Sequence, residues 1–140
     1  MAKQASPASI DRIFSALADP TRLRILHLLS GRELCVCYFV EILHCPQPKV
    51  SRHLAMLRAA GIVTARREGK WMHYRMLEPQ QPGIAQILAA TLTALTGQKS
   101  MQADAARLLK LTCAPTRYAA IAGAPLPAST ANACRTGTTR

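Results

Sequence analysis

The stretch that decides the fold runs from residue 45 to residue 61 and reads Cys45-Pro-Gln-Pro-Lys-Val-Ser-Arg-His-Leu-Ala-Met-Leu-Arg-Ala-Ala-Gly61. Two prolines within three residues cannot continue a helix, so the stretch begins with a turn. Pro48 suits the first turn of a new helix, and we expect that helix to end at Gly61. Helical spacing turns three apolar side chains inward (Val50, Leu54 and Leu57). The sequence therefore predicts a helix with a polar, basic outer face directly after a tight turn.

That outer face has the composition of a helix that enters the major groove of DNA. Such helices contact base edges with residues near their N-terminal end. Arg can bond guanine with two hydrogen bonds, and Gln can do the same with adenine. The candidate base or phosphate contacts are therefore Gln47, Lys49, Ser51 and Arg52. His53 lies at the edge of the inward face, so it is either a phosphate contact or a packed framework residue.

The residues before this stretch have the spacing of three further helices. Residues 9–18 carry apolar side chains at i, i+3, i+4 and i+7, which predicts an amphipathic helix. Asp19-Pro20 can cap and start a second helix, which we expect to end at Gly31. A third helix is expected from about Leu34 to His44. The third and fourth helices with their tight turn would form a helix-turn-helix.

After Gly61 the periodicity becomes that of strands. Residues 62–68 and 70–76 predict a hairpin around Glu68-Gly69. Its tip would carry three basic residues near a flanking minor groove, namely Arg66, Arg67 and Lys70. Residues 84–98 return to helical spacing. This order predicts a mainly α fold with a small β-hairpin, a winged helix-turn-helix.

The first helix and the 84–98 helix have apolar faces that a small helix-turn-helix core does not need. We expect these faces to form a homodimer interface, although they could instead close the core of a monomer. A two-fold dimer would place two reading helices in successive major grooves, so the operator would be an inverted repeat. We assign residues 1–98 to this domain. Residues 99–140 are expected to form an extension that is helical over about 101–112 and disordered from Pro115 onward.

The charge balance favours a polyanionic partner. The chain has 140 residues, a net charge of +11 and an isoelectric point near 10.2. Residues 49–75 alone contain seven Lys or Arg and one acid, Glu68. The N-terminus has no secretory signal, and the longest weakly apolar run, residues 84–97, is too short and too polar to span a bilayer. We therefore expect a cytoplasmic protein with reduced thiols, double-stranded DNA as partner and no membrane contact.

Two cysteines one residue apart, Cys35 and Cys37, precede the reading helix. Soft thiolates select thiophilic centres over hard cations. On a regular helix the two side chains would project about 200° apart, so holding one ion would require the first turn of the 34–44 helix to unwind. We expect that distortion to misplace the reading helix. A third ligand could be Cys113, Cys45, glutathione or water, whereas Cys134 is expected to be a spectator.

These motifs resemble those of the ArsR/SmtB family of metalloregulatory repressors, and within it the arsenic-responsive branch. The resemblance covers roughly residues 10–78 and lies in the segments Ala16–Leu26, Glu33–Cys37, Gln47–Leu54 and Gly69–Arg75. It implies a homodimeric repressor that is released from its operator by trivalent arsenic or antimony and needs no catalytic cofactor. The branch usually continues with Asp-Leu-Cys after its second cysteine. Here Tyr38-Phe39-Val40 follows, so the nearby third thiolate is missing.

Three other functions compete with this reading. A repressor of the same fold could sense thiol oxidation in place of a metalloid. A thiol protein could instead buffer metals, although the basic helix and hairpin argue against that. An enzyme is the least favoured, because the sequence has no Gly-rich phosphate loop and no paired acid–base site, and its four histidines are scattered. The family's zinc and cobalt site also has no counterpart, since residues 84–98 contain no His, Asp or Glu.

Overall fold

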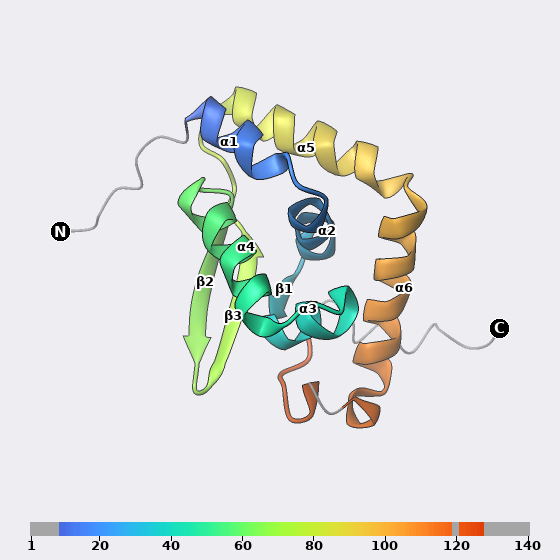
Figure 1. Ribbon diagram of the computed structural model, residues 1–140. Helices are drawn as coiled ribbons and strands as arrows, with labels where there is room; N and C mark the ends of the chain where they lie inside the picture. Colours follow the sequence, from blue (N-terminus) through green and yellow to red (C-terminus); the bar gives the residue numbers. More distant parts are fainter. Residues whose placement is uncertain (1–8, 119–120, 128–140) are drawn as a thin grey trace.

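The computed structural model describes residues 9–118 and 121–127, which form helices around a small antiparallel sheet (Figure 1). The elements in chain order are α1 (Ile10–Leu17), α2 (Pro20–Leu29), β1 (Glu33–Cys35), α3 (Val36–Leu43), α4 (Gln47–Ala59), β2 (Val63–Glu68), β3 (Trp71–Met76), α5 (Pro82–Thr96), α6 (Lys99–Cys113) and a short 3-10 turn (Pro115–Arg117). The predicted winged helix-turn-helix is confirmed, with α3 and α4 as the helix pair and β2–β3 as the wing.

Local signals explain where these elements begin and end. The Asp19 carboxylate accepts hydrogen bonds from the backbone N–H groups of Thr21 and Arg22, at 2.8 and 3.0 Å, and so caps α2. His44 takes a left-handed conformation, with φ of 52°, and ends α3. Gly69 has φ of 59° and allows the tight turn between β2 and β3. These are the positions at which the sequence placed its turns.

The three-stranded sheet corrects one expectation. The sequence assigned residues 34 and 35 to the third helix, but they belong to β1, which is antiparallel to β3 and places Cys35 opposite His73. The strand order is β1–β3–β2, so β1 extends the wing sheet on the side of β3. A three-residue strand is too short to show a periodicity, and its partner strand lies about 40 residues further along the chain. The helical spacing of the following residues therefore led to the prediction of a helix from residue 34.

The core lies between the sheet and helices α2 to α4. Tyr38 and Phe39 of α3 are completely buried, and so are Val50, Leu54 and Leu57 of α4. Helix α3 packs against α4, α6, β1 and β3 and therefore connects the wing to the second helix of the pair. On α1, Ile10 and Phe14 remain 54% exposed, as a partner-binding face would require. The homodimer itself stays a prediction.

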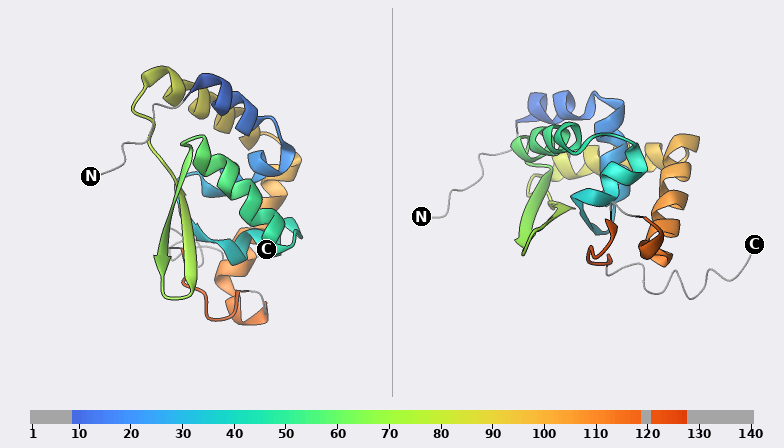
Figure 2. Two further views of the ribbon diagram at one scale, coloured as in Figure 1. Left: turned by 60° about the vertical axis from the view of Figure 1, so that its left-hand side comes forward. Right: turned by 60° about the horizontal axis from the view of Figure 1, so that its bottom comes forward.

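The C-terminal part of the chain is more ordered than its composition suggests. Helix α6 is fixed to α2 by a bidentate ion pair in which Arg24 donates to both oxygens of Asp104, at 2.7 and 2.8 Å. Beyond it, Ile121 is completely buried, and the segment 121–127 lies between the hairpin and the lower end of α6 (Figure 2). The disorder expected from Pro115 onward stays a prediction for the residues after 127. Cys134 lies outside the described residues.

Among residues 9–118 and 121–127, no helix is long and apolar enough to cross a bilayer.

Candidate nucleic-acid interface and thiol pair

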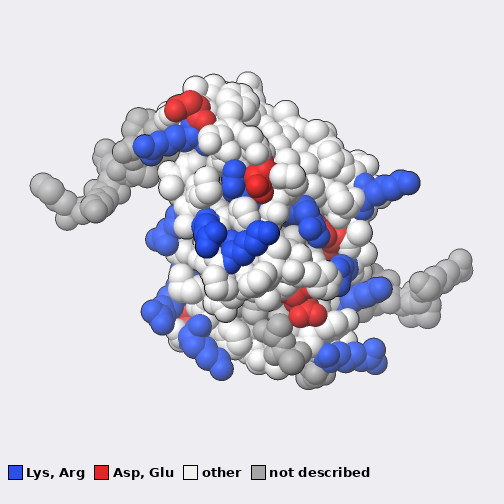
Figure 3. All heavy atoms as spheres, in the orientation of Figure 1, with Lys and Arg blue, Asp and Glu red and all other residues white. Residues whose placement is uncertain are grey.

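Helix α4 presents the predicted polar face to solvent. Gln47, Lys49 and Arg52 are exposed, and Ser51 is half-buried. Arg58 in the last turn is also exposed, although it was not among the contacts predicted from the sequence. Basic side chains gather over α4 and at the hairpin tip on one face of the molecule, with few acids between them (Figure 3). This face can neutralise phosphates along one stretch of duplex.

The three basic residues of the wing are not equivalent. The Arg66 guanidinium donates to Glu33 at 2.8 Å and to Glu68 at 3.2 Å, so its charge is largely compensated. The Arg66 hydrogen bond also holds the pKa of Glu33 below its usual value, against the effect of burial. Arg67 donates only to the Gly69 carbonyl, at 3.2 Å, and Lys70 lies over the Trp71 ring at 4.9 Å. Arg67 and Lys70 therefore remain available for phosphates.

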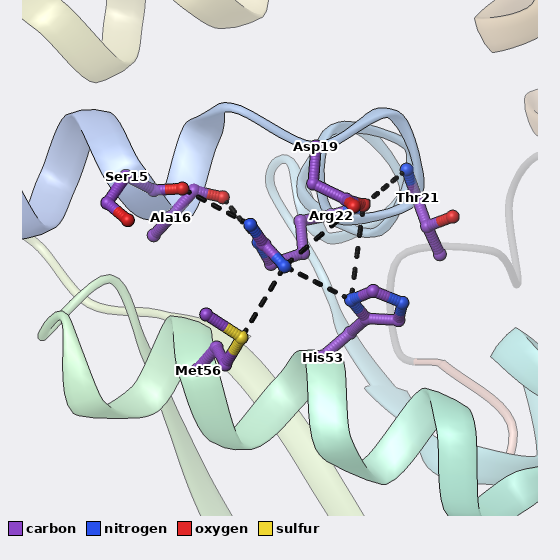
Figure 4. A network of polar contacts seen from close by, with 7 residues as sticks. All are labelled: Ser15, Ala16, Asp19, Thr21, Arg22, His53 and Met56. Carbon is purple, nitrogen blue, oxygen red and sulfur yellow. Dashed lines mark hydrogen bonds and ion pairs between the residues drawn. The ribbon is translucent and has the colours of Figure 1, made fainter.

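His53 is turned toward α2. Its Nδ1 lies 3.4 Å from an Arg22 nitrogen and 3.9 Å from an Asp19 oxygen, and the side chain is only 14% exposed (Figure 4). Burial would raise the pKa of Asp19, but the Arg22 N–H, the Arg22 guanidinium and His53 outweigh it and lower that pKa. In this position His53 connects α4 to the start of α2.

Arg22 is the centre of this network, and its role was not predicted from the sequence. Its guanidinium donates to the carbonyls of Ala16 at 2.7 Å and Ser15 at 3.2 Å, at the end of α1. The same group contacts the Met56 sulfur of α4 at 3.5 Å (Figure 4). A buried Arg is rare unless its donors are satisfied, and here they join three helices. The only sequence signal was an Arg three residues after a capping Asp.

The two thiols meet at the junction of the wing and the helix pair. Cys35 ends β1 with an extended backbone, φ −72° and ψ 148°, and Cys37 lies in the first turn of α3. They are 1% and 9% exposed. A hydrogen bond from the Cys37 thiol lowers the pKa of Cys35, and the same bond, with burial, raises the pKa of Cys37. Burial also raises the pKa of the adjacent Tyr38 to about 12.

This geometry corrects the predicted trigger. The sequence placed both cysteines on one helix, with sulfurs on opposite sides until a turn unwinds. Cys35 precedes the helix in extended backbone, so the two side chains do not project from one regular helix, and each thiol shifts the pKa of the other. The predicted conflict between two side chains on opposite sides of one helix is therefore wrong, because only Cys37 belongs to α3.

The described residues supply two close thiols and no more. Cys45 lies half-buried in the turn after α3. Cys113 is exposed at the end of α6 and is disulfide-bonded. Within residues 9–118 and 121–127, no three His, Cys, Asp or Glu side chains are grouped so that they could hold a metal ion. A trivalent centre held by Cys35 and Cys37 would therefore need a third partner.

Comparison with known proteins shows which family and which individual proteins this chain is similar to. Residues 19–65 match the family described as "Bacterial regulatory protein, arsR family". The chain is 41% identical over 102 residues to the arsenic resistance transcriptional regulator ArsR1 of Pseudomonas putida, covering 71% of this chain and 77% of that protein. It is 52% identical over 75 residues to the arsenical resistance operon repressor of Escherichia coli, covering 53% and 63%. Among solved structures, the antimony-specific transcriptional repressor AntR superposes with a TM-score of 0.50 at 27% identity, covering 69% of this chain and 89% of that one.

Proposed function

Because this chain belongs to the ArsR family and is a DNA-binding transcriptional repressor, we propose that trivalent arsenic or antimony, bound at Cys35 and Cys37, releases it from its operator. The observation that carries the proposal is the pair of buried thiols at the junction of β1 and α3, each of which shifts the pKa of the other. Its relatives are transcriptional regulators and not enzymes. The names of these relatives and of the antimony-specific repressor support the choice of ligand.

The position of the pair suggests how binding reaches the DNA contacts. Cys35 belongs to the strand that pairs with wing strand β3, and Cys37 belongs to the helix that packs on α4. When the thiol–thiol hydrogen bond is replaced by two bonds to one larger atom, the start of α3 must shift relative to β1. The wing and α4 then change their relative positions, and a duplex can no longer fit both.

The free energy needed for this response is modest. Moving a two-state equilibrium from 1:99 to 99:1 requires a ligand that favours one state by about 5.5 kcal/mol. Covalent bonds from two thiolates to a thiophilic atom can supply that difference if only the shifted state accommodates the ligand well. The change needs no large domain motion.

The DNA-binding side of the proposal involves α4 and the wing. Contacts to bases or phosphates would come from the exposed residues Gln47, Lys49, Ser51, Arg52, Arg67 and Lys70. Arg66 and His53 would act mainly by positioning the wing and α4, because both are held by other side chains. A cytoplasmic homodimer on an inverted repeat is proposed with this, and the exposed apolar residues of α1 support it.

The test measures operator affinity and its response to arsenite. Fluorescence anisotropy of the reduced protein on its upstream DNA should show binding that arsenite abolishes. Cys35→Ser and Cys37→Ser should bind DNA but ignore arsenite, and Cys45→Ser serves as a matched thiol control that responds like the wild type. If both pair variants are released by arsenite as readily as the wild type, the sensor assignment is wrong.

Thiol oxidation remains the alternative signal for the same fold. The lowered pKa of Cys35 favours it, because the thiolate is the reactive form. Release of the operator by peroxide in the absence of a metalloid, with no release by arsenite, would establish the redox function instead.

A further inference from the structure

The thiol pair leaves one coordination position of a trivalent metalloid open, and the structure offers a cavity next to it. We propose that a small carboxylate-bearing thiol of the glutathione type occupies this cavity and supplies the third sulfur. The proposal rests on the metalloid-sensing function proposed above and names the co-ligand of the same site.

The cavity has a volume of about 330 Å³ and lies between the wing sheet and the C-terminal segment. It is lined by Gly31, Arg32, Glu33, Arg66, His73 and residues 125–127. The volume lies at the lower end of the range of roughly 300–1,000 Å³ that is typical of small-molecule sites. It suits a ligand of a few residues and excludes a folded partner.

The cavity and the thiol pair share their neighbours. His73 lies opposite Cys35 in the β1–β3 register, so the two side chains are on the same face of the sheet. Glu33 precedes Cys35 by two residues and is on that face as well. Pro125 lines the cavity, and its carbonyl accepts a hydrogen bond of 3.5 Å from Tyr38, the residue after Cys37. Neither cysteine lines the cavity, but a ligand in it would contact Glu33 and His73, which lie on the same face of the sheet as Cys35.

The charges around the cavity favour an anion. Arg66 is already paired with Glu33 and Glu68. Arg32 is half-buried, and within the described part of the chain no group accepts a hydrogen bond from its side chain. Burial lowers the pKa of this guanidinium, and no carboxylate offsets the effect. The nitrogens of Arg32 are not among the buried side-chain atoms that lack a partner, so they face solvent, and a ligand carboxylate can accept charge-assisted hydrogen bonds from them.

The chemistry balances without an oxidant or a reductant. Arsenite enters as As(OH)₃, and each of three thiols replaces one hydroxide. Each exchange breaks an As–O bond, forms an As–S bond and releases one water that carries the thiol proton. Cys35, Cys37 and the free thiol supply the three sulfurs, and arsenic stays trivalent.

The test compares small thiols on the wild-type protein. The full chain is kept reduced with a phosphine, which has no thiol, and arsenite is titrated against the protein–operator complex. The added compounds are glutathione, cysteine, cysteamine (a thiol without a carboxylate) and S-methylglutathione (carboxylates without a free thiol). We expect glutathione to lower the arsenite needed for half-release about tenfold relative to cysteamine, as one charge-assisted hydrogen bond can. S-methylglutathione should have no effect. A stronger effect of cysteine than of glutathione would identify the amino acid as the physiological source of the same chemistry.

Two further measurements locate the co-ligand. Native mass spectrometry should detect one arsenic and one glutathione per protomer. Arg32→Gln should remove the advantage of glutathione over cysteamine, whereas Arg107→Gln, which removes an exposed charge from α6, should keep it. If Arg32→Gln does not fold, the comparison of thiols and the mass of the adduct, both measured on the wild type, still show whether a co-ligand binds.

The outcomes separate the two proposals. If arsenite releases the operator equally well with every thiol and the adduct carries arsenic alone, the co-ligand is refuted and the sensing function stands. If arsenite never releases the operator with any of these thiols, both proposals fail.

Discussion

Replacing Arg22 with Met should destabilise the protein and weaken its hold on DNA at the same time. The Arg22 side chain is 10% exposed and donates to two carbonyls at the end of α1, at 2.7 and 3.2 Å, while contacting His53 at 3.4 Å. Met keeps much of the side-chain volume but donates no hydrogen bond. Because each lost hydrogen bond to a charged group costs about 1.5–3 kcal/mol, and the freed carbonyls can partly find water, we expect a loss of about 3 kcal/mol.

The assay is urea unfolding followed by circular dichroism, with Arg12→Met on the exposed face of α1 as the control that also removes one charge. Operator affinity is measured at a urea-free condition where both variants are folded. We expect Arg22→Met to bind the operator more weakly than Arg12→Met, because Arg22 fixes α4 relative to α1 and α2. An unfolding free energy within about 1 kcal/mol of the wild type, with unchanged affinity, would refute the role given to this network.

Three further predictions follow from individual contacts. Asp104→Asn should destabilise the protein by about 2 kcal/mol in urea unfolding, less than for a fully buried pair because Arg24 remains 30% exposed and can be hydrated; no loss would mean that α6 is not anchored there. The pKa of Asp19 is lowered in the folded protein, so its contribution is present above the unfolded value of 3.8 and is lost as the pH falls through the folded pKa. Asp19→Asn should therefore lose less stability than the wild type as the pH falls below about 4. If thermal unfolding at several pH values gives parallel curves of stability against pH for the two proteins, this role of Asp19 is refuted. Arg67→Ala should reduce the salt dependence of operator binding by about one phosphate contact, whereas Arg66→Ala should reduce it less, because Glu33 and Glu68 already neutralise Arg66; equal effects in salt titrations would contradict this ranking.

Local signals were enough to predict the helix-turn-helix and the wing. The Asp19-Pro20 cap, the two prolines before α4 and the Glu68-Gly69 turn each act within a few residues, so their effect can be read from the chain alone. The periodic apolar residues of α4 likewise identified its buried face. The same locality explains why the candidate DNA contacts on α4 were found to be exposed, apart from the half-buried Ser51 and His53.

The features that relate the thiols to the rest of the fold depend on distant pairing. Strand β1 exists because β3 pairs with it, and that pairing moved Cys35 out of the helix and next to Cys37. The order of the 121–127 segment depends on the burial of Ile121 against other elements, which its Ala- and Pro-rich composition conceals.

The sequence by itself determined the class of fold, the basic reading face and the identity of the two sensing thiols proposed here, because each is encoded by residue type and short spacing. Only the tertiary structure decided that Cys35 lies outside α3, that Arg22 joins three helices and that a cavity lined by Arg32 lies beside the wing sheet. These features depend on contacts between segments separated by up to about 90 residues. Burial of the common core brings such segments together, and no local preference of the chain does so.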